Sequence, residues 1–82
     1  MSLVNLKQPL SKQVARALES YFQQLDGQEV IDLHALVISE VEKPLLEAVL
    51  NHTKHNQSKA AKILGLSRGT LRKKLSSYKL GI

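Results

Sequence analysis

Cysteine is absent from this sequence, and its 82 residues are enough for one domain at most. Without thiols the chain has neither a disulfide framework nor a thiolate metal site, and nothing in it calls for an oxidising compartment. A single core of this size buries only about 60% of the surface of the unfolded chain. Such a domain often recruits a second copy of itself to complete its core.

Long apolar stretches are also missing. The longest, such as Leu45–Leu50, is interrupted by Glu47. The N-terminus from Met1 to Leu10 has no charged region followed by an apolar run, the pattern of a secretory signal. We therefore expect a soluble, cytoplasmic protein that does not span a membrane.

Acidic residues are missing from the second half of the chain. All seven precede Ala48. Residues 1–47 also contain four basic residues, so the net charge of this segment is −3. From Ala48 to Ile82 the net charge is +8, from Lys54, Lys59, Lys62, Arg68, Arg72, Lys73, Lys74 and Lys79. A positive potential of this kind attracts polyanions, although a merely solvated basic surface would give the same count.

The first predicted helix covers residues 10–25, where apolar residues recur at intervals of three and four. Ser11 can cap its start. Asp26-Gly27 supplies the turn after it, because glycine adopts the left-handed backbone that commonly ends a helix.

The second predicted helix starts at Asp32 as its N-cap and extends to about Thr53. Pro44 lies inside it and removes a backbone hydrogen bond, so we expect one bent helix and not two separate ones. One broad apolar face consists of Leu33, Leu36, Val37, Val41, Leu45, Ala48, Val49 and His52. Ile38, Leu46 and Leu50 lie off that face, and this surplus of apolar surface indicates an intermolecular helical interface.

The remaining segment has the pattern of a helix-turn-helix, with helices at Gln57–Leu64 and from Arg68 to about Tyr78. Ala61 lies where the first helix would cross the second, because a larger side chain would push the backbones apart. Gly65 provides the positive φ of the sharp turn between them. The residues expected to face inward are Ile63, Leu64, Leu66, Leu71 and Leu75.

Ser67 is the expected N-cap of the last helix, which places Arg68 in the first turn, where a recognition helix meets base edges. The planar guanidinium of arginine can donate two hydrogen bonds to O6 and N7 of guanine, which discriminates by about 1–3 kcal/mol. Arg68 is therefore the first candidate for base recognition, and Ser67 could contact a neighbouring base.

Polar and basic side chains around the two helices are candidates for phosphate contacts. Short polar side chains near helix N-termini, at Asn56, Ser58 and Thr70, are expected to set the register on the duplex. Phosphate neutralisation is expected from Lys54, Lys59, Arg72, Lys73 and Lys74. The alternative is that Asn56 and Ser67 are only helix caps and the lysines only a solubilising surface.

These residues resemble the Fis family (factor for inversion stimulation) of bacterial nucleoid-associated proteins, over nearly everything from Lys7 to Lys79. The most specific stretch, Arg68–Leu75, is similar to the family's recognition helix. Other similar groups are Lys7-Gln8-Pro9-Leu10, Tyr21-Phe22, Leu25 with Gly27-Gln28, and Glu40-Val41-Glu42 with Pro44-Leu45-Leu46. Many enhancer-binding activators end in a related helix-turn-helix but are less similar in the segment before it.

The resemblance implies a homodimer in which the first two helices of each subunit form an intertwined four-helix core. Its two recognition helices would enter adjacent major grooves, closer together than a straight duplex turn allows, so the DNA would bend and degenerate, A/T-tolerant sites would be accepted. It also implies that Arg68 is the principal base contact and that Arg72 and Lys54 reach flanking DNA. Backbone contacts would come from Asn56, Ser58, Lys59, Thr70, Lys73 and Lys74.

Two positions depart from the family. Asparagine is common there where this chain has Ser67, which affects the base contact at that position. Fewer than ten residues precede Pro9, whereas the members that stimulate inversion carry a longer N-terminal β-hairpin arm that touches the recombinase. No recombinase contact is therefore expected.

Taken together, the sequence predicts a single all-α domain over residues 1–82, with four helices. Residues 10–53 would form the dimeric core and residues 56–79 the helix-turn-helix. The predicted function is a homodimeric, sequence-tolerant, DNA-bending transcriptional regulator of the nucleoid that binds double-stranded DNA and needs no cofactor.

Functions of other classes have weaker support in the sequence. A metal site would have to use His34, His52 and His55 without any cysteine, and two histidines three residues apart make a weak site. A hydrolase would need a nucleophile motif and a concave pocket, which a short helical chain hardly provides. The more serious alternative is a module whose basic helix, Arg68–Leu80, binds acidic partners or anionic lipid.

Overall fold

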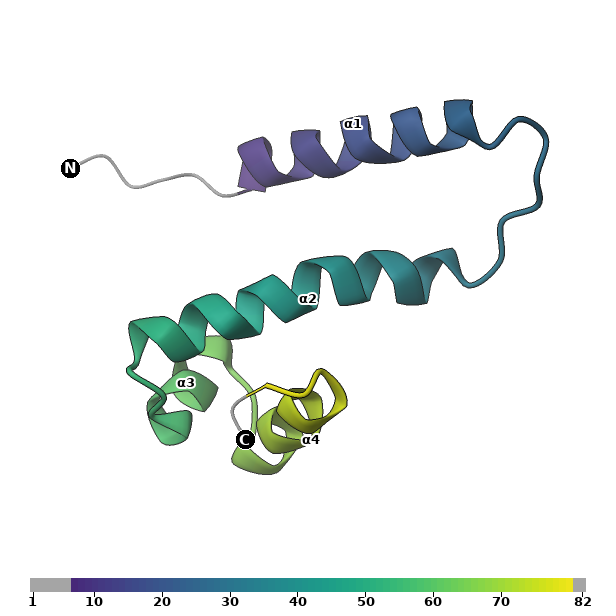
Figure 1. Ribbon diagram of the computed structural model, residues 1–82. Helices are drawn as coiled ribbons and strands as arrows, with labels where there is room; N and C mark the ends of the chain where they lie inside the picture. The colour runs from purple at the N-terminus through teal and green to yellow at the C-terminus, as the bar shows by residue number, and fades with distance from the viewer. Residues whose placement is uncertain (1–6, 81–82) are drawn as a thin grey trace. The chain divides into compact units, whose positions relative to one another are not determined.

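The computed structural model describes residues 7–80, and side chains from Pro9 onward. It contains four α-helices and, within the described residues, no strand (Figure 1). The predicted all-α class and the number of helices are confirmed. The chain forms two compact units, residues 1–31 and residues 32–82. The residues before Pro9, on which the recombinase prediction depends, lie mostly outside the described part of the chain.

The first unit contains α1, Lys7–Gln24. This helix begins three residues before the predicted start, so Ser11 lies inside the helix and the prediction that it caps the start was wrong. Pro9 is compatible with the early start, because proline in a first helical turn lacks only an N–H that has no intrahelical acceptor there. The predicted turn is confirmed, with φ of 52° at Asp26 and 81° at Gly27.

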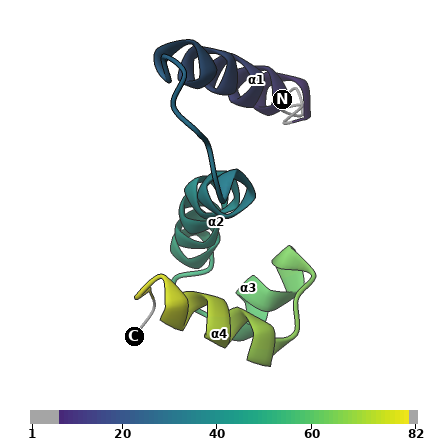
Figure 2. The same cartoon turned by 90° about the vertical axis from the view of Figure 1, so that its right-hand side faces the viewer.

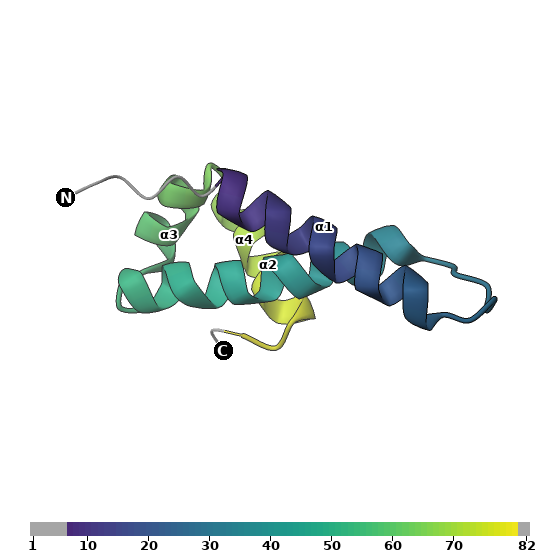
Figure 3. The same cartoon turned by 90° about the horizontal axis from the view of Figure 1, so that it is seen from above.

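The second unit begins with α2, Leu33–His52, followed by Thr53 as its C-cap. Pro44 lies inside α2, and the helix is uninterrupted, as predicted (Figure 3). Asp32 occupies the N-cap position, but its backbone is left-handed (φ 55°) and its side chain makes no capping hydrogen bond. The predicted N-cap position is therefore confirmed, but the cap is made by the backbone carbonyl of Asp32 alone, which accepts from the N–H of Leu36 at 3.2 Å.

The helix-turn-helix consists of α3, Gln57–Leu64, and α4, Arg68–Ser77 (Figure 2). The bounds of α3 match the prediction, and α4 ends one residue earlier, with Tyr78 as its C-cap. Gly65 has a φ of 73°, as predicted. This geometry lets the N–H of Leu66 donate to the carbonyl of Ala61 at 2.9 Å, which closes the end of α3.

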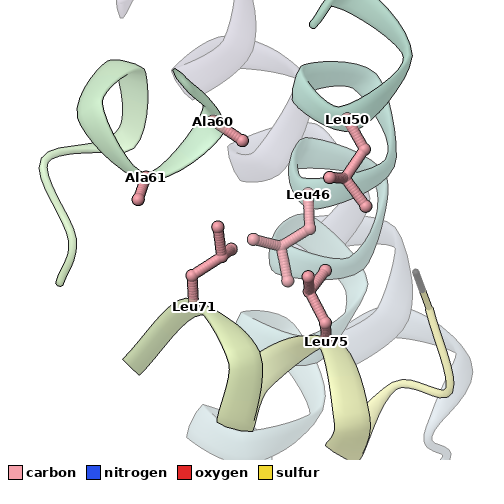
Figure 4. Close-up of a cluster of buried hydrophobic side chains, with 6 residues drawn as sticks. All are labelled: Leu46, Leu50, Ala60, Ala61, Leu71 and Leu75. Atoms are coloured by element: carbon pink, nitrogen blue, oxygen red, sulfur yellow. The ribbon is translucent and has the colours of Figure 1, made fainter. Parts of the chain in front are cut away.

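The buried core of the described residues is formed by α2, α3 and α4 (Figure 4). Its six side chains are Leu46, Leu50, Ala60, Ala61, Leu71 and Leu75. The small alanines of α3 let the other helices approach closely, as predicted for Ala61. The prediction missed Ala60, which is fully buried, and was wrong for Ile63, whose side chain is 57% exposed.

The leucines that α2 contributes to this core are Leu46 and Leu50, which the sequence placed off the main apolar face. Residues of the predicted main face, such as Leu36 and Leu45, are exposed in the isolated chain. Leu45 points about 100° away from Leu46 and about 140° away from Leu50 around the helix, so it lies on a different side of α2 from these two leucines. The C-terminal half of α2 is therefore part of the helix-turn-helix core, while another side of α2 remains apolar and uncovered.

No described helix is both long and apolar enough to cross a lipid bilayer.

Candidate DNA-binding interface

The turn between α2 and α3 carries two predicted DNA contacts, Lys54 and Asn56. Lys54 and His55 both have a left-handed backbone, with φ of 54° and 66°. The turn is closed by the N–H of His55, which donates to the carbonyl of Leu50 at 2.8 Å. α3 begins at Gln57, so Lys54 lies three residues before the start of that helix.

Asn56 is the N-cap of α3. Its Oδ1 accepts a hydrogen bond from the backbone N–H of Lys59 at 3.0 Å. The side chain is exposed, and the cap uses only its carbonyl oxygen. The amide nitrogen of Asn56 is a donor outside this bond, so the same side chain can cap the helix and donate to a phosphate oxygen.

Ser67 is the N-cap of α4, as predicted. Its Oγ accepts from the backbone N–H of Thr70 at 3.1 Å and donates to the Thr70 side-chain hydroxyl at 2.9 Å. Arg68 follows directly and is the first residue of the helix. The cap therefore fixes the backbone from which the candidate base contact extends.

Helix α4 has a buried side and an exposed side. Leu71 and Leu75 are buried against α2 and α3. Arg68, Arg72 and Lys73 are exposed. The exposed side of α4 therefore carries three cations that are free to approach a polyanion, as a recognition helix requires.

Lys74 differs from these cations, although it was grouped with them on sequence. Its Nζ lies 2.8 Å from Oε2 of Glu42 in α2, and the two side chains are 33% and 22% exposed. Oε1 of the same carboxylate accepts from the hydroxyl of Tyr78 at 2.7 Å. The structure thus pairs Lys74 with α2 and does not bring it together with the exposed cations.

The environment of Glu42 affects two ionisation equilibria. The hydrogen bond from Lys74, and next that from Tyr78, lowers the pKa of the Glu42 carboxyl below its usual value. The same carboxylate raises the pKa of the Tyr78 hydroxyl. Both shifts favour the state in which Glu42 is charged and Tyr78 is protonated, which is the hydrogen-bonded state.

Lys54 and Lys59 border a hollow of about 480 Å³ beside the α2–α3 turn. The other residues around it are His52, Thr53, Lys62 and Ile63. Lys62 was not among the site residues predicted from the sequence. Its charge was visible in the sequence, but its position beside Lys59 and Lys54 depends on the turn. Three lysines around one hollow give this surface a local excess of positive charge.

The histidines considered as metal ligands do not form a site in the described part of the chain. No group of three or more His, Asp or Glu side chains there is arranged to hold a metal ion. His34 lies in the first turn of α2 and His52 is its last residue, so nearly the whole length of the helix separates them. His55 lies in the turn that follows.

The fold and the exposed basic side of α4 define a helix-turn-helix regulator of the DNA-binding class. Comparison with known families shows to which family of such regulators the chain belongs. Residues 37–78 match the profile described as "Bacterial regulatory protein, Fis family", and residues 3–30 match "DNA-binding protein Fis N-terminal domain". The chain belongs to the Fis family, and the predicted resemblance is confirmed.

Individual relatives support the same assignment. The chain is 56% identical over 73 residues to a Fis-like DNA-binding protein of Pseudomonas aeruginosa, covering 89% of this chain and 70% of the relative. It is 53% identical over 72 residues to the DNA-binding protein Fis of Proteus mirabilis, covering 88% and 74%. The same figures describe its similarity to the protein of that name in Yersinia pestis. The names of these relatives describe DNA-binding proteins, and the matching family profile describes a regulatory protein.

Proposed function

We propose that the protein is a homodimeric, nucleoid-associated transcriptional regulator that inserts α4 of each subunit into adjacent major grooves of DNA and bends the duplex. The observation that supports this most directly is the exposure of Arg68, Arg72 and Lys73 on a capped helix that packs into a helix-turn-helix core. By this account the protein acts in the cytoplasm, where the nucleoid is.

Arg68 is the proposed base-reading residue, because the first turn of a recognition helix is nearest the base edges. Ser67 contributes at a neighbouring base. The proposed backbone contacts are Lys54, Asn56, Ser58, Lys59, Thr70, Arg72 and Lys73. Asn56 and Thr70 suit that role, because they lie at the N-terminal ends of helices, where the dipole and free N–H groups favour phosphate.

Dimerisation is proposed from the apolar surface that the isolated chain leaves exposed. Leu45 in α2 is 47% exposed and Phe22 in α1 is 51% exposed. Other large apolar side chains in the same state are Leu10, Tyr21, Ile31, Leu36 and Ile38. A soluble monomer rarely exposes so many large apolar groups, and a second copy of α1 and α2 would cover them.

Bending and sequence tolerance follow from the proposed dimer. One arginine in each recognition helix would read few bases, so most of the affinity would come from phosphate contacts, which carry no sequence information. Discrimination among sites would then come from how easily the central DNA curves and its minor groove narrows. A/T-rich centres should be favoured for that reason.

Fluorescence anisotropy of a labelled duplex tests the proposal. A duplex of about 27 base pairs, with an A/T-rich centre flanked by guanines, is titrated with the parent, with Arg68→Ala and with Arg16→Ala as the charge-matched control on α1. Arg68→Ala should lose about 1–3 kcal/mol on this duplex and keep its nonspecific binding. Arg16→Ala should behave as the parent.

Two results would contradict the proposal. Failure of the parent to bind this duplex at low salt would reject DNA binding by α4 and favour the lipid or acidic-partner alternative, which anionic vesicles then test directly. A complex that sediments as one subunit per duplex, or leaves the distance between dyes at the duplex ends unchanged, would reject the bent dimeric complex.

A further inference from the structure

Glu42 continues the side of α2 that packs on the helix-turn-helix. It precedes Leu46 by four residues and Leu50 by eight, so the three side chains follow one another along a single helix face. The leucines are buried in the core, and Glu42 is partly buried at its edge. A carboxylate therefore stands where α2 meets α4.

The two oxygens of Glu42 hold two points on α4. Oε2 accepts from Nζ of Lys74 at 2.8 Å, and Oε1 accepts from the hydroxyl of Tyr78 at 2.7 Å. Lys74 and Tyr78 are four residues apart and lie one above the other on the helix. Because both contacts come from one rigid carboxylate, they restrain the rotation of α4 about its own axis as well as its angle to α2.

The ion pair also separates Lys74 from the exposed cations of α4. Arg72 and Lys74 lie roughly 160° apart around a helix that turns about 100° per residue. The Lys74 flank is drawn to α2, while Arg68, Arg72 and Lys73 are left exposed. The positive charge of Lys74 is balanced by Glu42 and contributes little to the field on the exposed side.

We propose that Glu42 is a positioning residue for DNA recognition: it sets the orientation at which α4 is presented to the major groove and withholds Lys74 from the phosphate backbone. This inference rests on the proposed entry of α4 into the groove. It gives Lys74 a different role from the phosphate contact predicted from the sequence. Lys74 becomes part of the link between α2 and α4, and the phosphate contacts on this helix fall to its neighbours.

The salt dependence of binding distinguishes these roles. The slope of log K against log salt concentration changes by about 0.9 for each phosphate that the protein no longer neutralises. The variants are Lys74→Met and, as a matched control with the same loss of charge, Lys73→Met. Lys73→Met should reduce the slope by about 0.9 for each recognition helix bound, whereas Lys74→Met should leave it unchanged. A merely stabilising role for Lys73 would not alter the slope in this way.

The converse experiment frees Lys74. Glu42→Gln should steepen the slope by about 0.9 for each bound helix, because the released ammonium becomes available to phosphate. This increase should vanish in the double variant Glu42→Gln/Lys74→Met. Glu47→Gln, an exposed carboxylate of the same helix, removes the same charge and should leave the slope unchanged. Glu42→Gln should also lower the ratio of specific to nonspecific affinity severalfold, as the orientation of α4 relaxes.

Tyr78→Phe keeps the ion pair and removes one hydrogen bond. It should lower the specificity ratio less than Glu42→Gln and should not alter the slope, which gives a second test if Glu42→Gln proves unstable. The inference is overturned if Lys74→Met reduces the slope as much as Lys73→Met does. In that case Arg68→Ala and Lys73→Met still impair binding, and DNA recognition by α4 stands. If none of these variants affects binding, the proposed function fails and this inference fails with it.

Discussion

Ser67 and Thr70 are joined by two hydrogen bonds at the start of α4. The Ser67 hydroxyl accepts from the Thr70 backbone N–H at 3.1 Å and donates to the Thr70 hydroxyl at 2.9 Å. Both residues are proposed to contact DNA, so the hydroxyls that cap α4 would also face its proposed ligand. The stability of the helix end and the strictness of base recognition can therefore be separated by substitution.

Replacing Ser67 with alanine removes the cap and should lower the free energy of unfolding by about 0.5–2 kcal/mol. Ser67→Asn keeps a capping oxygen and should stay within about 0.5 kcal/mol of the parent. Urea denaturation followed by circular dichroism measures both. A panel of duplexes that differ at one base beside the guanine should then show altered preference for Ser67→Asn without any loss of stability. Equal stability of the alanine variant and the parent would contradict the capping role.

Leu71 and Ile63 make a matched pair that tests the assignment of the core. Leu71 is fully buried, and Leu71→Ala should lower the free energy of unfolding by about 2–5 kcal/mol. Ile63 was expected to be buried but is exposed beside the hollow near the α2–α3 turn. Ile63→Ala should therefore change stability by no more than about 0.5 kcal/mol. A large loss for Ile63→Ala would show that something covers this residue in solution.

Replacing His55 with glycine should increase the stability of the fold. Its φ of 66° lies in the left-handed region, which costs an ordinary residue roughly 1–2 kcal/mol. Glycine removes that strain but loses about 0.5–1 kcal/mol in backbone entropy on folding. His55→Gly should therefore stabilise the fold by up to about 1 kcal/mol in urea denaturation. Glu47→Gly, inside α2, should instead destabilise by roughly 0.5 kcal/mol or more. Equal losses in the two variants would argue against strain at His55.

The hydrogen bonds of Glu42 should make stability depend on pH at both ends of the range. The pKa of Glu42 is lowered in the folded state, so its contribution is present above the ordinary value of 4.5 and is lost as the pH falls through the lowered pKa. The pKa of Tyr78 is raised, so its contribution is present below the ordinary value of 10.0 and is lost as the pH rises through the raised pKa.

Urea denaturation at a series of pH values measures this dependence. Glu42→Gln should flatten the acid limb of the profile relative to the parent, and Tyr78→Phe should flatten the alkaline limb. An acid limb that is unchanged in Glu42→Gln would assign the acid sensitivity to other carboxylates.

The helix-turn-helix was predictable almost to the residue because its signals are local. Gly65 and Ser67 act within a few residues of their own positions, and each has the conformation or hydrogen bond expected of it. The first residue of α1 was harder to predict from the sequence. Ser11 is a good capping residue, which favours a helix that starts after it, but Pro9 is equally compatible with the first turn of a helix that starts earlier. The two signals lie two residues apart, and the sequence alone did not rank them.

The packing of α2 could not be obtained from periodicity. Spacing shows which residues share a side of a helix but not which neighbour covers that side, and α2 is apolar on more than one side. Leu46 and Leu50 are buried because α3 and α4 pack against their side of α2, whereas Leu45 is exposed. The contact between Glu42 and Lys74 spans 32 residues of sequence and has no local signal at all.

The circumference of α2 is divided among several tasks. Leu46 and Leu50 belong to the core of the helix-turn-helix, and Ile38 and Leu45 lie on an uncovered apolar side. Neutral drift in this helix should then be confined to the remaining strip, Glu40, Lys43 and Glu47, whose side chains are exposed. Among related sequences, the positions along this strip of α2 should therefore vary almost freely, and the positions on its other sides should vary little. The width of the variable strip would then indicate how much of the helix surface is covered by neighbouring elements.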